Sequence, residues 1–245
     1  MHFEFDLFRS VVMSSLDDLA EFRDILEAQM PEVKQLDRER IINEFKLFTA
    51  DNRDEEELIL AEQNTELEIL DRKFAMTYPR ISRYSFLTML FMHIETNLKA
   101  VCVEIAKRKK LKYRASEFRG TVFDQAKLFL IKEASLPSFA PAAWETLTNL
   151  QKLRNCIVHC GGRVADSRDR ADIESLTTRK DLGLSITPPM FPGLTKDDPF
   201  VDADEGLLQI EPIFCTTILE GIKSLFGQIF EKAGCFGPDH VVRVD

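Results

Sequence analysis

The hydrophobic side chains recur three or four residues apart along most of this chain, which is the spacing of amphipathic helices. In the first third, this spacing predicts a helix over residues 5–30. We expect that helix to stop near Pro31, because proline lacks the N–H that a helix interior needs. Further helices are predicted over 31–48 and 51–76, and the most apolar helix follows over 81–109.

The second half of the chain continues the helical pattern with one interruption. Helices are predicted over 121–134 and 141–158, and a double glycine ends the second of them. Two short apolar stretches, 182–187 and 206–210, predict a β-hairpin with a long tip. A final amphipathic helix is predicted over 211–232. The fold class expected is therefore all-α, a helical bundle with a small β-hairpin insertion before the last helix.

These elements predict three parts of the chain. Residues 1–78 are expected to form N-terminal helices and a long charged arm that packs on the bundle. Residues 79–234 are expected to form the helical domain, with 163–210 as its loop and hairpin insertion. Residues 235–245 are expected to be an unstructured tail. A chain of 245 residues has room for a domain of this size with an appendage.

The composition is that of a soluble globular protein, with 44% hydrophobic and 30% charged residues. No apolar run reaches the ~18 residues that a membrane-spanning helix needs, and the N-terminus lacks the positive stretch of a secretory signal. The five cysteines are odd in number and scattered, which is typical of reduced thiols rather than of a disulfide framework. We therefore expect a cytoplasmic protein that does not insert into a membrane.

Charge is unevenly distributed along the chain. The net charge is −9, and residues 51–72 alone carry nine acidic and two basic side chains. This acidic arm is expected to be either a solvated helix face or a partner-binding coil. A basic cluster elsewhere keeps a polyanion such as RNA open as a partner. Its side chains are expected either to contact RNA phosphates or to complement the end of the preceding helix: Lys107, Arg108, Lys109, Lys110 and Lys112.

Three side chains suited to phosphate chemistry lie at the end of one predicted helix: Arg154, Asn155 and His159. Asn155 and His159 are four residues apart and share a helix face. Histidine serves as a general acid or base, arginine matches a phosphate with a charged fork, and asparagine can orient the histidine. Together they predict metal-independent cleavage of RNA by its own 2'-hydroxyl. Because one histidine is too few for two proton transfers, we expect a symmetric dimer with a composite cleft.

Other chemistries have weaker support in the sequence. Cys156, His159 and Cys160 have the spacing of half a zinc site, but no second cluster completes it. We therefore expect small residues that pack a helix, and neither a metal nor another cofactor. His93, on the most apolar helix, is expected to be packed rather than catalytic. The sequence contains no GxSxG nucleophile elbow and no GxxxxGK phosphate loop.

The arginine and the histidine, with four residues between them and a polar residue after the arginine, match the Arg-x4-6-His signature of HEPN domains. The most apolar helix, which contains Glu95, and the hairpin and last helix also resemble that family, so that the likeness covers about residues 79–232. The resemblance implies a HEPN-like bundle and a dimeric, metal-independent endoribonuclease, often a toxin or an antiviral defence protein with a partner such as an antitoxin. It implies catalytic roles for Arg154, Asn155 and His159, and a supporting role for Glu95.

Two other functions are compatible with the sequence. A HEPN-like dimerisation or binding module without catalysis would use Arg154 and His159 to cap the helix and to pair with Glu95, buried within one chain. An unrelated helical regulator would bind a protein with its acidic arm. Catalysis instead requires the arginine and the histidine to be exposed in a shared cleft. Family members silenced by an AMP-transferring antitoxin carry a tyrosine where this chain has Gly161, so that mode of control is not expected.

Overall fold

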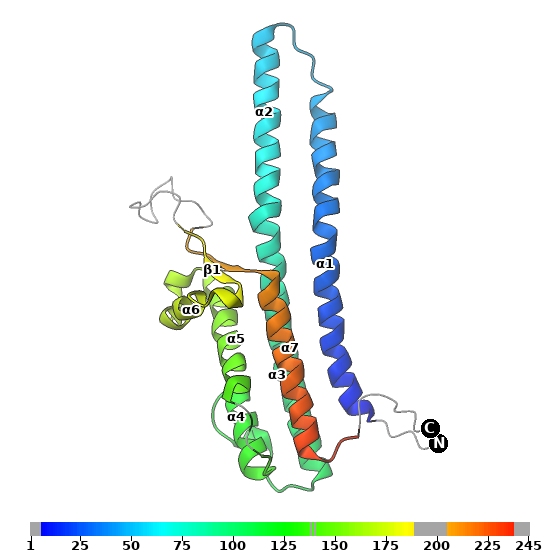
Figure 1. The fold of residues 1–245 in the computed structure, drawn as a ribbon, viewed down its shortest axis with the longest axis vertical. Coiled ribbons are helices and arrows are strands. Elements are labelled where there is room, and N and C mark those ends of the chain that lie inside the picture. The colour runs from blue at the N-terminus through cyan, green and yellow to red at the C-terminus, as the bar shows by residue number, and fades with distance from the viewer. Residues whose placement is uncertain (1–5, 138, 140, 189–204, 238–245) are drawn as a thin grey trace, which may run out of the picture. The chain divides into compact units, whose positions relative to one another are not determined.

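The computed structural model describes residues 6–137, 139, 141–188 and 205–237. The chain is mostly helical, which confirms the all-α class (Figure 1). The helices are α1 (Leu7–Phe45), α2 (Arg53–Arg72), α3 (Tyr78–Arg108), α4 (Val122–Leu128), α5 (Pro141–Cys160), α6 (Arg170–Thr177) and α7 (Pro212–Ala233). The strands are β1 (Leu184–Ile186) and β2 (Leu208–Ile210), and two π-helical turns follow α2 (Lys73–Thr77) and α4 (Phe129–Glu133).

The chain divides into two compact units, one formed by residues 21–83 and the other by 1–20 together with 84–245. The helices α1 and α3 each contribute to both. The predicted boundary after residue 78 lies close to residue 83, whereas residues 1–20, which the prediction places with the N-terminal helices, group with residues 84–245. They belong to the larger unit because three of their apolar side chains are buried in its core: Val12, Leu16 and Leu19.

Residues 21–83 form a helical hairpin held by ion pairs. Lys34 Nζ, on α1, lies 2.8 Å from Asp71 Oδ1 on α2. Near the other end of the hairpin, Arg83 donates to both carboxylate oxygens of Glu27, at 2.7 and 2.9 Å. Both bonds of Arg83 reach one carboxylate, an arrangement that fixes geometry better than a single contact does.

The helix α2 is the acidic arm that the sequence predicts. It begins at Arg53, where Asn52 Oδ1 accepts a hydrogen bond from the Glu55 N–H at 2.9 Å and satisfies one of the first N–H groups. Within α2, Leu70 is the buried residue. Apart from Asp71, which is partly buried, the acidic residues of α2 are exposed, as expected for a solvated helix face.

The helices of the structure continue through two prolines at which the sequence predicts a boundary, Pro31 and Pro79. Pro31 lies inside α1, so the predicted stop there is wrong. An interior proline removes one main-chain hydrogen bond, at a cost of about 3 kcal/mol. The helical sequences before and after Pro31 offset this cost, so α1 continues through it. Pro79 falls in the first turn of α3, which directly follows the π turn Lys73–Thr77. The Tyr78 N–H donates to the Lys73 carbonyl, which makes α2 and α3 continuous.

The core of the larger unit lies between α3, α5 and α7 (Figure 1). Each presents buried apolar side chains at helical spacing, including Leu90, Ile94 and Leu98 on α3, Leu147, Leu150 and Leu153 on α5, and Ile218, Ile222 and Ile229 on α7. The start of α1 is tied to this core by polar contacts. Asn97 donates to Ser15 Oγ at 3.0 Å, and Lys223 Nζ lies 2.7 Å from Asp17.

The strands β1 and β2 pair antiparallel, with Ser185 opposite Gln209, which confirms the predicted hairpin. Most of its predicted long tip, residues 189–204, lies outside the described residues. The helix α6 was not predicted, because this short charged helix buries only Ile173 and Leu176.

The segment that follows α7 is packed where it is described, contrary to the expectation of an unstructured tail. The ring centroid of Phe236 lies 4.9 Å from that of Phe230 and 6.0 Å from that of Phe8. This aromatic cluster joins the end of α7 to the start of α1. The rest of the predicted tail, 238–245, lies outside the described residues.

Two helical stretches have the length and composition of membrane spans, Arg53–Arg108 and α7. Of the most apolar window in each, 44% and 50% is buried inside the protein. Partial burial of this kind is the pattern of an amphipathic core helix, whose apolar stripe packs against its neighbours.

Candidate functional site

The helix α5 ends in a turn fixed by two glycines. Gly161 and Gly162 have φ angles of +59° and +86°, in the left-handed region that favours glycine. A Cβ on Gly162 would collide with the hydroxyl of Tyr84, which donates to the Leu208 carbonyl at 2.6 Å. The Leu208 N–H donates in turn to the Gly162 carbonyl at 2.9 Å. The end of α5 is therefore tied to both α3 and β2.

A hollow of about 280 Å³ lies beside this last turn of α5. Its lining comes from the helix and from the loop that follows it: Asn155, His159, Cys160, Asp166, Ser167 and Arg168. Asn155 and His159 thus meet in one hollow, as their spacing of four residues predicts. His159 is exposed, and its imidazole makes no hydrogen bond or ion pair with any of the described residues.

Arg154 does not line this hollow and is held by α3 instead. Its guanidinium carbon lies 5.1 Å from the ring centroid of Phe91, a cation–π contact. Its Nη1 donates to Asn155 Oδ1 at 3.2 Å, while its Nε is buried without a hydrogen-bond partner. Arg154 is therefore linked to the hollow through Asn155.

Glu95 is half-buried on α3, about one turn beyond Phe91. Among the described residues it makes no hydrogen bond or ion pair, either with Arg154 or with any other residue. The expected pairing of Glu95 with Arg154 is therefore not formed. The charge of Arg154 is left without a carboxylate partner in the part of the chain that the structure describes.

The basic cluster lies far from His159. It begins about 24 Å beyond Phe91 along the axis of α3, at 1.5 Å per residue. The guanidinium of Arg108 is occupied inside the fold, by Asp6, by Glu104 at 2.7 Å and by the ring of Phe236 at 4.5 Å. RNA binding by Arg108 stays a prediction, beside these contacts within the fold. The lysines of the cluster are at least partly exposed: Lys107, Lys109, Lys110 and Lys112.

Cys156, on α5, is buried, and burial raises the pKa of its thiol to about 11. Burial likewise raises the pKa of Cys102, on α3, to about 12. The described residues contain no group of three or more His, Cys, Asp or Glu side chains that could hold a metal ion.

The sequence did not point to Ser167 or Arg168 as part of the hollow. Ser167 is buried, and its Oγ accepts a hydrogen bond from the Asp169 N–H at 3.2 Å. Arg168 has an 80% exposed side chain and adds a cation beside His159. No motif signals either residue, because the loop reaches the hollow only through the fold of residues 161–169.

Comparisons with protein-family models, with curated proteins and with solved structures found no match to this chain.

Proposed function

We propose that this protein is a metal-independent endoribonuclease of the HEPN type that cleaves RNA at the hollow beside His159. The observation that carries the proposal is the surroundings of the His159 imidazole. This imidazole is exposed, has no partner among the described residues, and shares a hollow with Asn155 and the cation of Arg168. A histidine in that position contributes little to folding, whereas it is well placed to exchange protons with a bound phosphodiester.

The proposed reaction is transesterification followed by product release. His159 takes the proton of the ribose 2'-hydroxyl, and the 2'-oxygen attacks the adjacent phosphorus. The bond from phosphorus to the 5'-oxygen breaks, which leaves a 2',3'-cyclic phosphate and, after protonation, a 5'-hydroxyl. Arg168, which lines the hollow, would offset the charge that builds on the phosphorane.

The leaving oxygen needs a proton donor that one hollow does not supply. In a homodimer, the same histidine of a second copy would act as the acid while the first acts as the base. Asn155 would orient the imidazole, and Arg154 would hold Asn155 through its hydrogen bond. The exposed lysines of the basic cluster would bind RNA away from the cleaved bond.

The expected biological role is that of a cytoplasmic toxin or defence nuclease. An enzyme that cuts RNA without a metal needs restraint, and an antitoxin or a defence-system partner would supply it. The exposed acidic side chains of α2 would be a surface for such a protein partner.

The test is incubation of total RNA with the purified protein in EDTA. Wild type and the control variant His93→Ala are expected to cleave, because His93 lies on α3 outside the hollow. Arg154→Ala and His159→Ala are expected to lose cleavage by at least ~100-fold. Equal cleavage by wild type and His159→Ala would refute the proposal.

A non-catalytic HEPN-like binding module is the second candidate, and the placement of Arg154 favours it. Its guanidinium packs on Phe91 instead of lining the hollow, as a structural arginine would. This alternative predicts that none of the four proteins cleaves RNA and that Arg154→Ala mainly lowers stability.

A further inference from the structure

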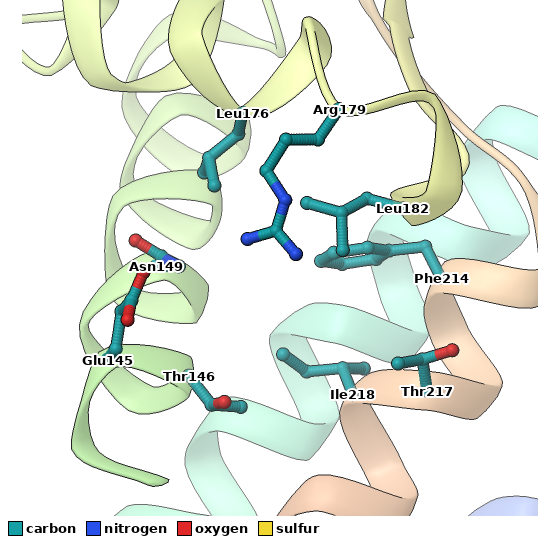
Figure 2. Close-up of a pocket in the computed structure, with 9 residues that line it drawn as sticks. All are labelled: Glu145, Thr146, Asn149, Leu176, Arg179, Leu182, Phe214, Thr217 and Ile218. Atoms are coloured by element: carbon teal, nitrogen blue, oxygen red, sulfur yellow. The ribbon is translucent and has the colours of Figure 1, made fainter. Parts of the chain in front are cut away.

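A second pocket lies on α5, more than two turns before His159. Its volume is about 230 Å³, and its walls come from α5, α7 and the segment around the end of α6. At ~30 Å³ per water molecule, it has room for one bicyclic ring but not for two stacked nucleotides. Figure 2 shows the Arg179 guanidinium directed into this space, facing Asn149 and Glu145, with the ring of Phe214 beside it.

The side chains of Glu145, Asn149 and Arg179 converge on this pocket without pairing with one another. The side chains of Glu145 and Asn149 make no hydrogen bond or ion pair with any of the described residues. Arg179 pairs with Asp181 at 3.3 Å, but these side chains are 53% and 70% exposed, so the pair is weak and exchangeable. A carboxylate and a guanidinium thus line one pocket without forming an ion pair with each other.

Apart from Thr146 and Thr217, the rest of the lining is apolar and suits the face of a planar ring. Phe214 and Ile218 of α7 are buried, and Leu176 and Leu182 close the other side. Aromatic and aliphatic walls with a few polar groups at the rim are the usual form of a small-molecule site. The ligand expected is therefore flat, with hydrogen-bonding groups confined to its edges.

We propose that this pocket binds a guanine base. Guanine presents O6 and N7 as adjacent acceptors, which match the two-pronged donor of an arginine such as Arg179. On the neighbouring edge it presents the N1–H and 2-amino donors, which match the carboxylate of Glu145. Adenine places an amino donor beside N7 and therefore does not match Arg179. Cytosine has adjacent acceptors in O2 and N3 but offers a carboxylate only its 4-amino group, whereas guanine offers both N1–H and the 2-amino group. The amide of Asn149, four residues from Glu145 on the same helix, adds a further partner.

The base belongs either to a free guanine nucleotide or to an RNA strand. The two sites lie on one face of α5, since Glu145 and His159 are 14 residues apart in the sequence, which is about four helical turns. Between them Lys152 pairs with Asp172 of α6 at 2.7 Å, so α6 separates the pocket from the hollow. Use of the pocket as a subsite for RNA rests on the proposed function, whereas binding of the base itself does not.

The test is isothermal titration with GMP, IMP, 7-deaza-GMP and AMP. Wild type is expected to bind GMP at least ~10-fold more tightly than AMP, and to bind IMP, which lacks the 2-amino group, and 7-deaza-GMP, which lacks N7, more weakly than GMP. Glu145→Gln should lose the preference for GMP over IMP, and Arg179→Ala the preference over 7-deaza-GMP. The control variants Glu231→Gln and Arg170→Ala, exposed and outside the pocket, should retain both.

Equal binding of GMP and AMP by wild type, or preferences that survive both pocket substitutions, would overturn the proposal. Competition in the cleavage-deficient His159→Ala protein separates the two sources of the base. A short single-stranded RNA that displaces GMP only when it contains guanine assigns the pocket to RNA. GMP binding without such displacement assigns it to a free nucleotide. None of these binding experiments measures cleavage. They therefore test guanine binding even if the protein is not a nuclease.

Discussion

The guanidinium of Arg154 lies over the ring of Phe91, with 5.1 Å between its central carbon and the ring centroid. This contact joins α5 to α3 one turn before His159. Phe91 is itself fixed, since its ring meets that of Phe123 edge to face at 5.3 Å between centroids. The position of Arg154, and through it that of Asn155, therefore depends on the core.

Replacing Arg154 by lysine tests this arrangement. Lysine keeps the charge but loses the planar fork that stacks on Phe91 and reaches Asn155. We expect RNA cleavage to fall by at least ~10-fold, and the free energy of unfolding to fall by about 1 kcal/mol. Both are measured on the same preparation, by cleavage rate and by urea denaturation. The exposed Arg170→Lys serves as the control and should change neither quantity; an unchanged Arg154→Lys would show that the stacking has no role.

The two glycines after α5 should differ in their tolerance of alanine. Gly161→Ala meets only the cost of a left-handed backbone, about 1 kcal/mol, because no atom lies near its added Cβ. Gly162→Ala must also displace Tyr84, so we expect a loss of about 2–4 kcal/mol. Equilibrium denaturation of the two variants measures the difference. Equal losses would mean that the close approach of Tyr84 does not constrain this turn.

The pair of Asp6 and Arg108 predicts a loss of stability in acid. Burial alone would raise the pKa of Asp6, but hydrogen bonds from Arg108 and from the N–H groups of Arg9 and Gly237 together lower it below its ordinary value. The stability it contributes is present above the unfolded pKa and is lost as the pH falls through the folded one.

Asp6→Asn should therefore cost about 1–3 kcal/mol at pH 7 and reduce the acid dependence. Asp71→Asn, which removes an exposed pair with Lys34, should cost less stability than Asp6→Asn. Denaturation of wild type and both variants from pH 7 to pH 3 gives these values. An Asp6→Asn protein with the wild-type acid profile would exclude this pair as the cause.

The cysteines at the end of α5 should differ in reactivity. Burial raises the pKa of Cys156 to about 11, while Cys160 is partly exposed in the hollow. Since the thiolate is the reactive form, iodoacetamide at pH 8 should modify Cys160 at least ~10-fold faster than Cys156. Peptide mass spectrometry gives both rates, and unfolded protein, in which both react, is the control. Comparable rates in the folded protein would contradict the burial of Cys156.

The sequence predicts what depends on local spacing. Asn155 and His159 share a face because they are four residues apart, and the glycines after them mark the end of the helix. What it misses is set by contacts between distant segments. In the sequence, Arg108 belongs to a basic run. In the structure, its guanidinium donates a hydrogen bond to Asp6, 102 residues away in the sequence. The stacking of Arg154 on Phe91 and the entry of Arg168 into the hollow likewise follow from packing that no local pattern encodes.

The most direct measurement uses a short RNA that the wild-type protein cleaves at one defined bond, in EDTA. The nuclease proposal predicts products with 2',3'-cyclic phosphate ends from wild type and from His93→Ala. It predicts a rate at least ~100-fold lower for His159→Ala, and no cleavage when the nucleotide before that bond carries a 2'-deoxyribose. Cleavage of the deoxy-substituted strand, or wild-type cleavage by His159→Ala, would contradict it.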